Sequence, residues 1–439
     1  MSYIRVNYSK WLKIKHCLPF VNELLIIGRP GGGKTRGVVK ALKKIVRNGE
    51  KILFLTPLKI HRDIVGKWFS DSFSVLVFKG KQDLCSEVKW IYENGSFIEV
   101  LAKCLGCSKK CPFKGQIKSV NEYDVVVSTH AMGLLFSIPI FKFDYLVIDE
   151  VDQYYKAFSK KIPVKVVEER EKDKFGRRVA SYIKSRFKRI LNAYVPRVVL
   201  PRSRHKVFIT ATAPKDAKLL NYIIGEWDSE GFCTYFLPYE NKDKVLVYDK
   251  VLLWGKHKNW LPQILTVIKE ICNIERSVGI VSRNYEVTRV ISEYLKDSGF
   301  NVLDDYNNIN DINKASRIHI ITVNSKACRG VSLPDKDIVI ALFQYMQVEK
   351  RGFHIKYYLE ECPIEKLGKA LNYCDNLQAI FRFIRRADRE HVVVLLDKRL
   401  YTSFKETTMQ YYLEDVEKRG EVFKFRDIAS LLNKVKDIF

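Results

Sequence analysis

The feature that most constrains the fold is the segment GRPGGGKT at residues 28–35, which lies between two patterned stretches. NELLIIG at 22–28 has the continuous apolar pattern of a buried strand, and TRGVVKALKKIVRNG at 35–49 has helical spacing of its apolar residues. A glycine-rich turn that ends in Lys-Thr and joins a strand to a helix can curl its N–H groups around phosphate oxygens. The sequence therefore predicts an α/β fold with a phosphate site after its first strand.

Further apolar runs alternate with helical patterns along the chain. They are rich in Val, Ile, Leu and Phe, as expected for parallel strands that are covered on both faces. The alternation occurs twice, which predicts two α/β domains with parallel sheets, at residues 1–245 and 246–439. The runs are KILFLTP (51–57), YDVVVST (123–129), FDYLVIDE (143–150), KVFITAT (206–212), SVGIVS (277–282), RIHIITV (317–323), KDIVIAL (336–342) and HVVVLLD (391–397).

The glycine-rich segment supplies a complete set of phosphate ligands. Gly28, Gly31 and Gly33 let the main chain approach the phosphates of ATP closely. Lys34 is expected to reach the β- and γ-phosphates, and Thr35 is expected to hold Mg²⁺. The competing interpretation is a glycine-rich turn without a ligand, and the strand before it and helix after it argue against that interpretation.

An acidic pair follows another predicted strand. Asp149 and Glu150 come directly after the apolar residues YLVI. We expect Asp149 to bind Mg²⁺, directly or through water, and Glu150 to polarise the attacking water. The alternative is an acidic cap on the helix that follows the strand.

The net charge of +26 indicates a polyanionic partner. Nucleic acid is the commonest such partner, and the alternative is a lysine-rich surface without a specific ligand. No run of eighteen or more apolar residues occurs, so we expect no transmembrane span and no membrane partner. The basic N-terminus lacks the apolar core of a signal peptide. We expect a monomeric protein that acts in the cytoplasm, or in a host cell if it is viral.

A segment at residues 79–120, which interrupts the first domain, carries clustered cysteines. The spacing Cys85-x18-Cys104-x2-Cys107-x3-Cys111 places three thiols close together and one farther away. Thiols are usually reduced inside cells, so a clustered set favours a metal or cofactor over disulfides. The spacing favours an iron–sulfur cluster and leaves structural zinc open, because zinc sites usually use two close pairs.

The order of several motifs resembles superfamily 2 helicases. Asp149–Asp152 resembles their DEAD/DEAH box, although Asp152 stands where DEAH has histidine, and Thr210–Thr212 resembles their SAT motif. Residues 324–334 resemble motif V and residues 378–386 resemble motif VI. The resemblance covers most of the chain and implies two RecA-like domains that hold ATP between them.

Motif VI would provide the residues of the second domain that act on ATP. Gln378, Arg382 and Arg385 occupy the positions that match this motif, and Phe381 stands where the family has glycine. Arginines at this place stabilise charge on the transferred phosphoryl group. Because Arg382 and Arg385 are three residues apart, we expect both on one face of a helix.

The cysteine segment narrows the resemblance to helicases of the XPD/DinG type. In that family a four-cysteine domain with a 4Fe–4S cluster lies between the early motifs and the DEAH box, as residues 79–120 do here. Residues 78–85 and 123–135 resemble the segments before and after that domain. The charged segment 153–205, with helical patterns, falls where the family carries its arch domain, but it is much shorter.

Lysines near the cysteines suggest contacts to a single strand. Lys109, Lys110 and Lys114 offer phosphate contacts, and Phe113 offers a stacking surface. The alternative is that the lysines solubilise a small domain.

Three functions fit these features. The first is an ATP-dependent helicase that moves on single-stranded DNA, 5′→3′ by the resemblance, and separates forked duplexes, with RNA not excluded. The second is an ATP-driven translocase or remodeller that works on RNA or on protein-coated DNA without strong unwinding, which the short arch-like segment favours. The third is a zinc-bearing nucleic-acid-binding protein with a vestigial ATP site.

Overall fold

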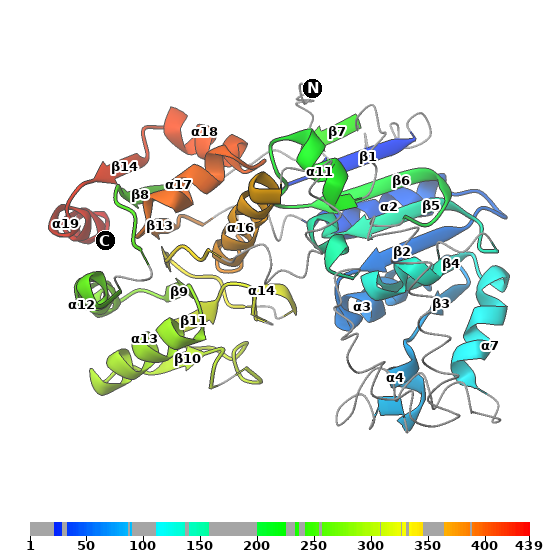
Figure 1. Cartoon of the computed structure of the whole chain (residues 1–439), viewed down its shortest axis with the longest axis horizontal. Coiled ribbons are helices and arrows are strands. Elements are labelled where there is room, and N and C mark those ends of the chain that lie inside the picture. The colour runs from blue at the N-terminus through cyan, green and yellow to red at the C-terminus, as the bar shows by residue number, and fades with distance from the viewer. Residues whose placement is uncertain are drawn as a thin grey trace, which may run out of the picture.

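A computed structural model of the chain contains two β-sheets, which form the centres of two lobes (Figure 1). Each sheet has seven strands within the described part of the chain. All strand pairs described there are parallel. The structure describes residues 22–28, 33–86, 88–89, 111–136, 140–157, 200–224, 233–236, 242–253, 257–307, 309–325, 327–330, 333–345, 364–386 and 389–439.

The first sheet has the strand order β3-β4-β2-β5-β6-β1-β7. Its five central strands coincide with the apolar runs that the sequence predicts. The edge strands β3 and β7 are short, and the three residues of β3 are only half-buried, so they lack the predicted pattern. The bounds are β1 (Glu23–Ile27), β2 (Ile52–Thr56), β3 (Val75–Val77), β4 (Val125–Thr129), β5 (Phe143–Asp149), β6 (Ser203–Thr210) and β7 (Cys233–Phe236).

Helices cover both faces of the first sheet. Val38 and Leu42 of α2 and Phe69 of α3 pack against one face, whereas Leu220 of α11 and Phe136 of α8 pack against the other. The helices are α2 (Lys34–Ile45), α3 (Lys59–Phe69), α4 (Lys81–Leu84), α7 (Pro112–Ser119), α8 (Gly133–Phe136) and α11 (Ala217–Ile224), with 3₁₀ turns η1 (Val120–Glu122), η2 (His130–Met132) and η3 (Val151–Ala157).

The second sheet has the order β10-β11-β9-β12-β13-β8-β14. Strands β9, β11, β12 and β13 match the predicted runs, whereas β8, β10 and β14 lie outside them. The bounds are β8 (Lys244–Tyr248), β9 (Val278–Ser282), β10 (Val302–Asp304), β11 (Ile318–Thr322), β12 (Ile338–Ala341), β13 (Val392–Leu395) and β14 (Val422–Phe425). The predicted α/β fold with two parallel sheets is therefore confirmed.

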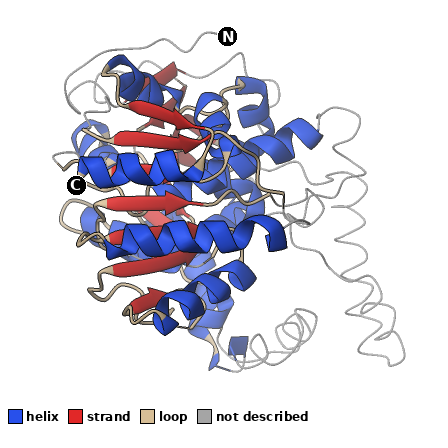
Figure 2. Ribbon diagram, turned by 90° about the vertical axis from the view of Figure 1, so that its left-hand side faces the viewer, coloured by secondary structure: helices blue, strands red, loops and turns tan. Residues whose placement is uncertain are grey.

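Helices lie against the strands of the second sheet (Figure 2). They are α12 (His257–Asn273), α13 (Tyr285–Asp297), α14 (Ala327–Gly330), α16 (Ile364–Ile380), α17 (Lys398–Lys405), α18 (Gln410–Lys418) and α19 (Ile428–Ile438). Helix α16 belongs to both lobes, because Leu377 and Ile380 pack in the second core while Leu367 and Leu371 pack against the first. The helix thereby connects the two sheets.

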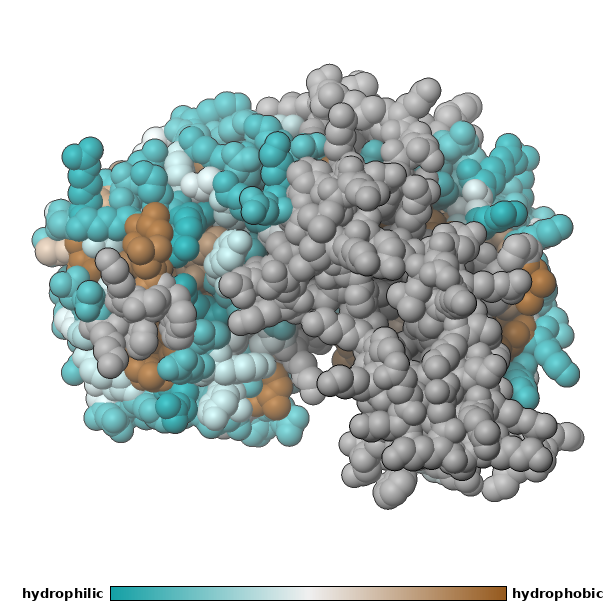
Figure 3. Space-filling model, viewed as in Figure 1, coloured by the Kyte–Doolittle hydropathy of each residue, from teal (hydrophilic) through white to brown (hydrophobic). Residues whose placement is uncertain are grey.

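The coloured surface of both lobes is mostly hydrophilic on the face shown in Figure 3. Among the described helices, none combines the length and the low polarity needed to cross a membrane.

The predicted insertions and the domain division are described only in part. Residues 90–110, half of the first insertion, lie outside the described residues. So do residues 158–199, which are most of the second insertion. Strand β8 begins at Lys244 and belongs to the second sheet. The proposed domains, 1–245 and 246–439, therefore divide within β8, and the first two residues of this strand fall in the first proposed domain.

Candidate functional site: a cavity between the two sheets

The glycine-rich segment joins β1 to α2, as its pattern predicts. Gly28 follows β1, and Gly33 precedes α2 with a φ of 73°. A Cβ atom would be strained at this positive φ, which explains glycine there. Residues 29–32, which include the predicted ligand Gly31, lie outside the described residues. Helix N-termini attract anions because their first N–H groups lack partners within the helix.

Lys34, the first residue of α2, reaches back to the residue that follows β1. Its side chain is buried, and Nζ donates a hydrogen bond of 2.8 Å to the carbonyl oxygen of Gly28. Burial lowers the pKa of Lys34 to about 8, although the nearby charges of Asp149 and Glu150 oppose this change. A poorly solvated ammonium group gains strongly from a phosphate ligand.

Thr35 and Asp149 meet at the carboxyl ends of β1 and β5. The Thr35 hydroxyl donates a hydrogen bond of 2.9 Å to Oδ2 of Asp149. Burial and the neighbouring Glu150 raise the pKa of Asp149 to about 7. A hydroxyl and a carboxylate side by side are oxygen ligands of the kind that Mg²⁺ prefers, so the donor set fits this ion.

Glu150 is held in a strained conformation at the edge of the cavity. Its φ of 49° is unusual for a residue other than glycine. Its Oε2 atom is buried and has no hydrogen-bond partner among the described residues, whereas Oε1 lies 3.5 Å from the guanidinium of Arg382. A buried carboxylate oxygen without a donor can accept a hydrogen bond from water.

Asp152, the residue that replaces the DEAH histidine, connects the ends of two strands. The Thr210 hydroxyl at the end of β6 donates to its Oδ1 over 2.8 Å, and the Gln153 amide donates to its Oδ2 over 2.6 Å. Burial and the charge of Glu150 raise the pKa of Asp152 to about 6. Asp152 therefore forms a hydrogen-bonded junction between the box and the SAT-like segment.

Gln153 also reaches the second lobe. Its Nε2 atom lies 3.4 Å from Oδ1 of Asp375 and 3.4 Å from Oε1 of Gln378, both on α16. Gln378 is buried and lines the cavity. The residue after the acidic box thus contacts the helix that leads to the arginines.

The arginines do not lie on a helix, which corrects the prediction from their spacing. Helix α16 ends at Ile380, and Arg382 and Arg385 lie in the segment that follows. The Arg382 N–H bonds to the carbonyl oxygen of Ala379 over 3.1 Å, which tightens the last turn and ends the helix. Both arginines nevertheless line the same cavity as the phosphate segment.

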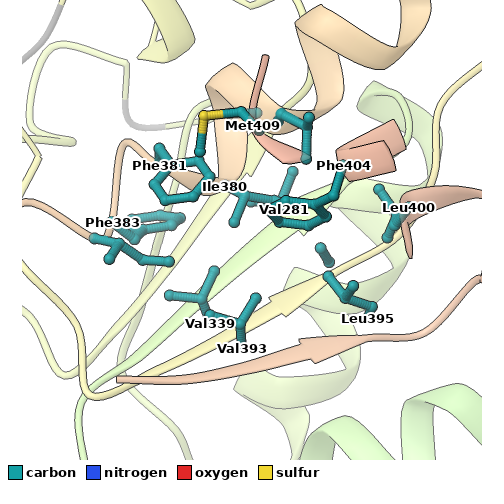
Figure 4. Packing of buried hydrophobic residues seen from close by; sticks show 14 of the residues in the cluster. Val281, Val339, Ile380, Phe381, Phe383, Val393, Leu395, Leu400, Phe404 and Met409 are labelled. Atoms are coloured by element: carbon teal, nitrogen blue, oxygen red, sulfur yellow. The ribbon is translucent and has the colours of Figure 1, made fainter. Parts of the chain in front are cut away.

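Two phenylalanines anchor the arginine segment in the second core (Figure 4). Phe381 packs edge-on against Tyr412, with ring centroids 5.0 Å apart. Phe383 is fully buried beside Gly279, where a Cβ atom would lie 2.6 Å from its ring. Phe381, which replaces the family's glycine, therefore fixes the main chain on one side of Arg382.

A cavity of ≈ 510 Å³ contains these groups. Its volume is within the range of about 300–1,000 Å³ that is usual for ligand sites. The first lobe contributes Lys34, Thr35, Asp149 and Glu150, and the second contributes Gln378, Arg382 and Arg385.

Sequence reasoning missed one wall of this cavity, which α3 provides. Ile60, His61, Ile64 and Trp68 line it. The exposed fractions of Ile60 and Ile64 are 55% and 40%, which is high for apolar residues four positions apart on one helix. In the sequence, two isoleucines four residues apart, just after the strand that forms β2, indicate an apolar helix face that could contact a ligand.

The described part of the cysteine segment brings two predicted ligands onto neighbouring helices. Cys85 follows α4 and Cys111 precedes α7, and the two helices contact each other. Both thiols are half-buried, and neither forms a disulfide. Cys104 and Cys107 lie outside the described residues. Within those residues, no three His, Cys, Asp or Glu side chains are grouped to hold a metal.

The predicted nucleic-acid contacts differ in exposure. Lys114 is exposed. Phe113 is half-buried and packs edge-on against Phe78 at 5.6 Å between centroids, so much of its ring is already in contact with protein. Lys109 and Lys110 lie outside the described residues.

The sequence matches no protein-family model and no curated protein. The structure is similar to that of Xpd4 from S. tokodaii, with a TM-score of 0.56, 14% identity, and 93% of this chain and 97% of that chain covered. A structure of an XPD helicase matches with a TM-score of 0.58, 14% identity, and coverage of 96% and 100%. An apo XPD structure matches with a TM-score of 0.55, 12% identity, and coverage of 94% and 99%. The chain has the fold of these XPD structures, with two RecA-like parallel sheets.

Proposed function

We propose that the chain is an ATP-dependent helicase that moves along single-stranded DNA in the 5′→3′ direction and separates forked duplexes. One observation carries this proposal. The residues of the proposed phosphate site and the carboxylates, from the first lobe, line the same cavity as Arg382 and Arg385 of the second lobe. The net charge of +26 supports a nucleic-acid partner. The fold supports an XPD-like helicase, and the direction rests on the sequence resemblance.

Binding of the triphosphate would use the first lobe. The N-terminus of α2 receives the phosphates, and the Lys34 ammonium exchanges the carbonyl oxygen of Gly28 for phosphate oxygens. Thr35 and Asp149 would hold Mg²⁺ in place of their mutual hydrogen bond. The ion, when bound, neutralises phosphate charge, and its charge favours the ionised form of Asp149.

Hydrolysis would use both lobes. Glu150 orients a water and accepts its proton as the oxygen bonds to the γ-phosphorus and the bond to the β-phosphate oxygen breaks. The products are inorganic phosphate and ADP. The guanidinium groups of Arg382 and Arg385 stabilise the charge on the transferred phosphoryl group, an effect worth about 10³–10⁵-fold in rate in related reactions.

Loss of the γ-phosphate would weaken the attraction between the lobes. The arginine segment then releases the first lobe, and the lobes move relative to each other. Repeated closing and opening would move a bound single strand along the protein.

The test is ATP turnover, measured without nucleic acid and with single-stranded DNA or RNA, together with strand separation on duplexes with 5′ or 3′ tails. The proposal predicts stimulation by single-stranded DNA and unwinding of 5′-tailed duplexes. Turnover that does not respond to nucleic acid, without unwinding of either duplex, would refute it. Displacement of a bound protein without unwinding would instead identify a translocase, and full function of Lys34→Ala would identify a vestigial ATP site.

We further propose a 4Fe–4S cluster held by Cys85, Cys104, Cys107 and Cys111. Support comes from the contact between α4 and α7, which brings together the segments that carry the first and last of these cysteines. The cluster would brace the insertion and supply no step of hydrolysis. Protein purified without oxygen should contain about four iron atoms per chain, and Cys107→Ser should lose them. One zinc atom per chain would identify the alternative site.

A further inference from the structure

A buried ion-pair network lies beneath the arginine segment. His391 has no exposed surface, and its Nδ1 and Nε2 atoms lie 2.7 Å from Oδ1 of Asp243 and 3.0 Å from Oδ2 of Asp335. Asp243 directly precedes β8, His391 directly precedes β13, and Asp335 lies three residues before β12. These three strands are neighbours in the sheet. The network therefore lies at the amino ends of three adjacent inner strands of the second sheet.

His391 carries a positive charge in this network. Two carboxylates accept hydrogen bonds from its ring, so both nitrogens must donate, which requires the imidazolium form. Burial lowers the pKa of His391, but the hydrogen bonds and charges of Asp243 and Asp335 outweigh burial and raise it to about 9.

Other polar groups complete the network from neighbouring elements. The Tyr412 hydroxyl donates to Oδ2 of Asp243 over 2.8 Å, and the Arg419 guanidinium donates to the carbonyl oxygen of that residue over 3.2 Å. The Arg389 guanidinium lies 3.5 Å from Oδ2 of Asp335. Such a set of partners restricts rotation of both carboxyl groups.

The remaining oxygen of Asp335 holds the main chain that carries the arginines. Its Oδ1 accepts hydrogen bonds from the N–H groups of Arg385 over 2.7 Å and Arg386 over 3.3 Å. The N–H group of Lys336 bonds to the carbonyl oxygen of Phe383 over 3.0 Å, which adds a second connection to the same segment. Asp335 therefore links the buried histidine to the segment whose side chains enter the cavity.

We infer that Asp335, held by His391, which is itself held by Asp243, is a positioning residue that sets the place of Arg385 in the cavity. The inference rests on the proposed role of Arg385 in ATP hydrolysis. An arginine that must meet a phosphoryl group gains from a main chain that is fixed before the substrate binds, because a displacement of about 1 Å can cost about 10²-fold in rate. Packing of Phe381 and Phe383 anchors one side of the segment, and Asp335 anchors the other.

The test is a double-mutant cycle on single-strand-stimulated ATP turnover. Asp335→Ala should lower kcat about 10- to 100-fold and leave KM for ATP near its wild-type value. Arg385→Ala should lower kcat at least about 10³-fold. Added to Arg385→Ala, the Asp335→Ala change should have almost no further effect, because it acts through that arginine.

Two further variants separate positioning from folding. Asp337→Ala is the matched control, because this carboxylate hydrogen-bonds to Ser277 and to the Arg389 guanidinium. It should lower the melting temperature and leave kcat near the wild-type value. Asp335→Asn keeps the shape of the side chain but presents an N–H group to His391, and it should give a smaller kcat loss of the same kind.

The outcomes distinguish this inference from the proposed function. If wild type does not hydrolyse ATP, or if Arg385→Ala retains full turnover, the proposed function fails and the inference fails with it. If both behave as proposed, the inference alone is overturned by either of two results. These are an unchanged kcat in Asp335→Ala and Asp335→Asn, or an equal fold-loss from Asp335→Ala in the wild-type and Arg385→Ala backgrounds.

Discussion

The two lobes place their charged groups in the cavity by different means. In the first lobe, Lys34 and Thr35 begin the helix after β1, and Asp149 and Glu150 lie at the end of β5. Position along a strand therefore decides where these groups lie. In the second lobe, the arginines lie in an irregular segment after α16, and buried contacts fix it.

The difference shows which parts of such a site resist substitution. A group at the end of a parallel strand depends on the whole sheet and moves only if the sheet moves. A group in an irregular segment depends on a few side chains, here Phe381, Phe383 and Asp335, that lie outside the cavity lining. Substitution of these supports should therefore affect turnover without removing a single ligand of the nucleotide.

The largest expected effect separates turnover from binding. Arg385→Ala should lower kcat by about 10³-fold or more, because the transition state loses a positive charge, and should leave ATP affinity in the absence of turnover nearly unchanged. Stopped-flow binding and steady-state turnover measure the two quantities. Lys366→Ala, an exposed lysine of α16, is the control and should match wild type. Equal losses in binding and turnover would contradict a transition-state role.

Removal of an anchor should destabilise the second lobe. Phe381→Ala removes a fully buried ring, so the free energy of unfolding should fall by about 3–5 kcal/mol. Denaturant unfolding measures the change, and Val251→Ala, at an exposed position of the same lobe, should change it by less than about 0.5 kcal/mol. A small loss for Phe381→Ala would show that this ring does not anchor the segment.

Lys34→Ala tests the first lobe. It should weaken ATP binding and lower turnover by about 10²–10³-fold, because the phosphates lose their nearest ammonium group. Nucleotide binding by fluorescence and ATP turnover both report this loss. Lys40→Ala, at an exposed position on α2, should have no effect on either. Unchanged ATP affinity in Lys34→Ala would place the phosphates elsewhere.

The smallest expected effect is a change in pH dependence. The folded pKa of Asp149, about 7, exceeds that of an unfolded aspartate, so the folded state binds this proton more tightly. The carboxyl group therefore loses its stabilising contribution as the pH rises from about 4 through 7. Asp149→Asn should raise the melting temperature of the nucleotide-free protein at pH 8 and flatten its decline above pH 5. A melting temperature at pH 8 at or below that of wild type would contradict this ionisation.

Sequence patterns located the central strands and the first-lobe ligands because both depend on neighbouring residues. The run that forms β5 and the pair after it are contiguous, as are the phosphate segment and α2. The edge strands β3 and β14 were missed because they are short and half-exposed, so their side chains lack a continuous apolar pattern. A feature that lies wholly within one local segment leaves its pattern in the sequence of that segment.

Features that join distant segments could not be read from spacing. Thr210 and Asp152 are 58 residues apart, and Gln153 and Asp375 are 222 apart, so only the folded chain shows these contacts. The three-residue spacing of Arg382 and Arg385 suggested a helix, but α16 ends before them because the segment turns to reach the second core. Tertiary packing overrides local periodicity at such positions.

In the proposed enzyme, one nucleotide contacts both lobes at once. A photoreactive ATP analogue with its reactive group on the γ-phosphate tests this directly, in the presence of single-stranded DNA. Mass spectrometry of the labelled peptides should find the label both in the peptide that contains Lys34 and in the peptide that contains Arg382 and Arg385. Label confined to the first lobe, in protein that turns over ATP, would contradict the shared site.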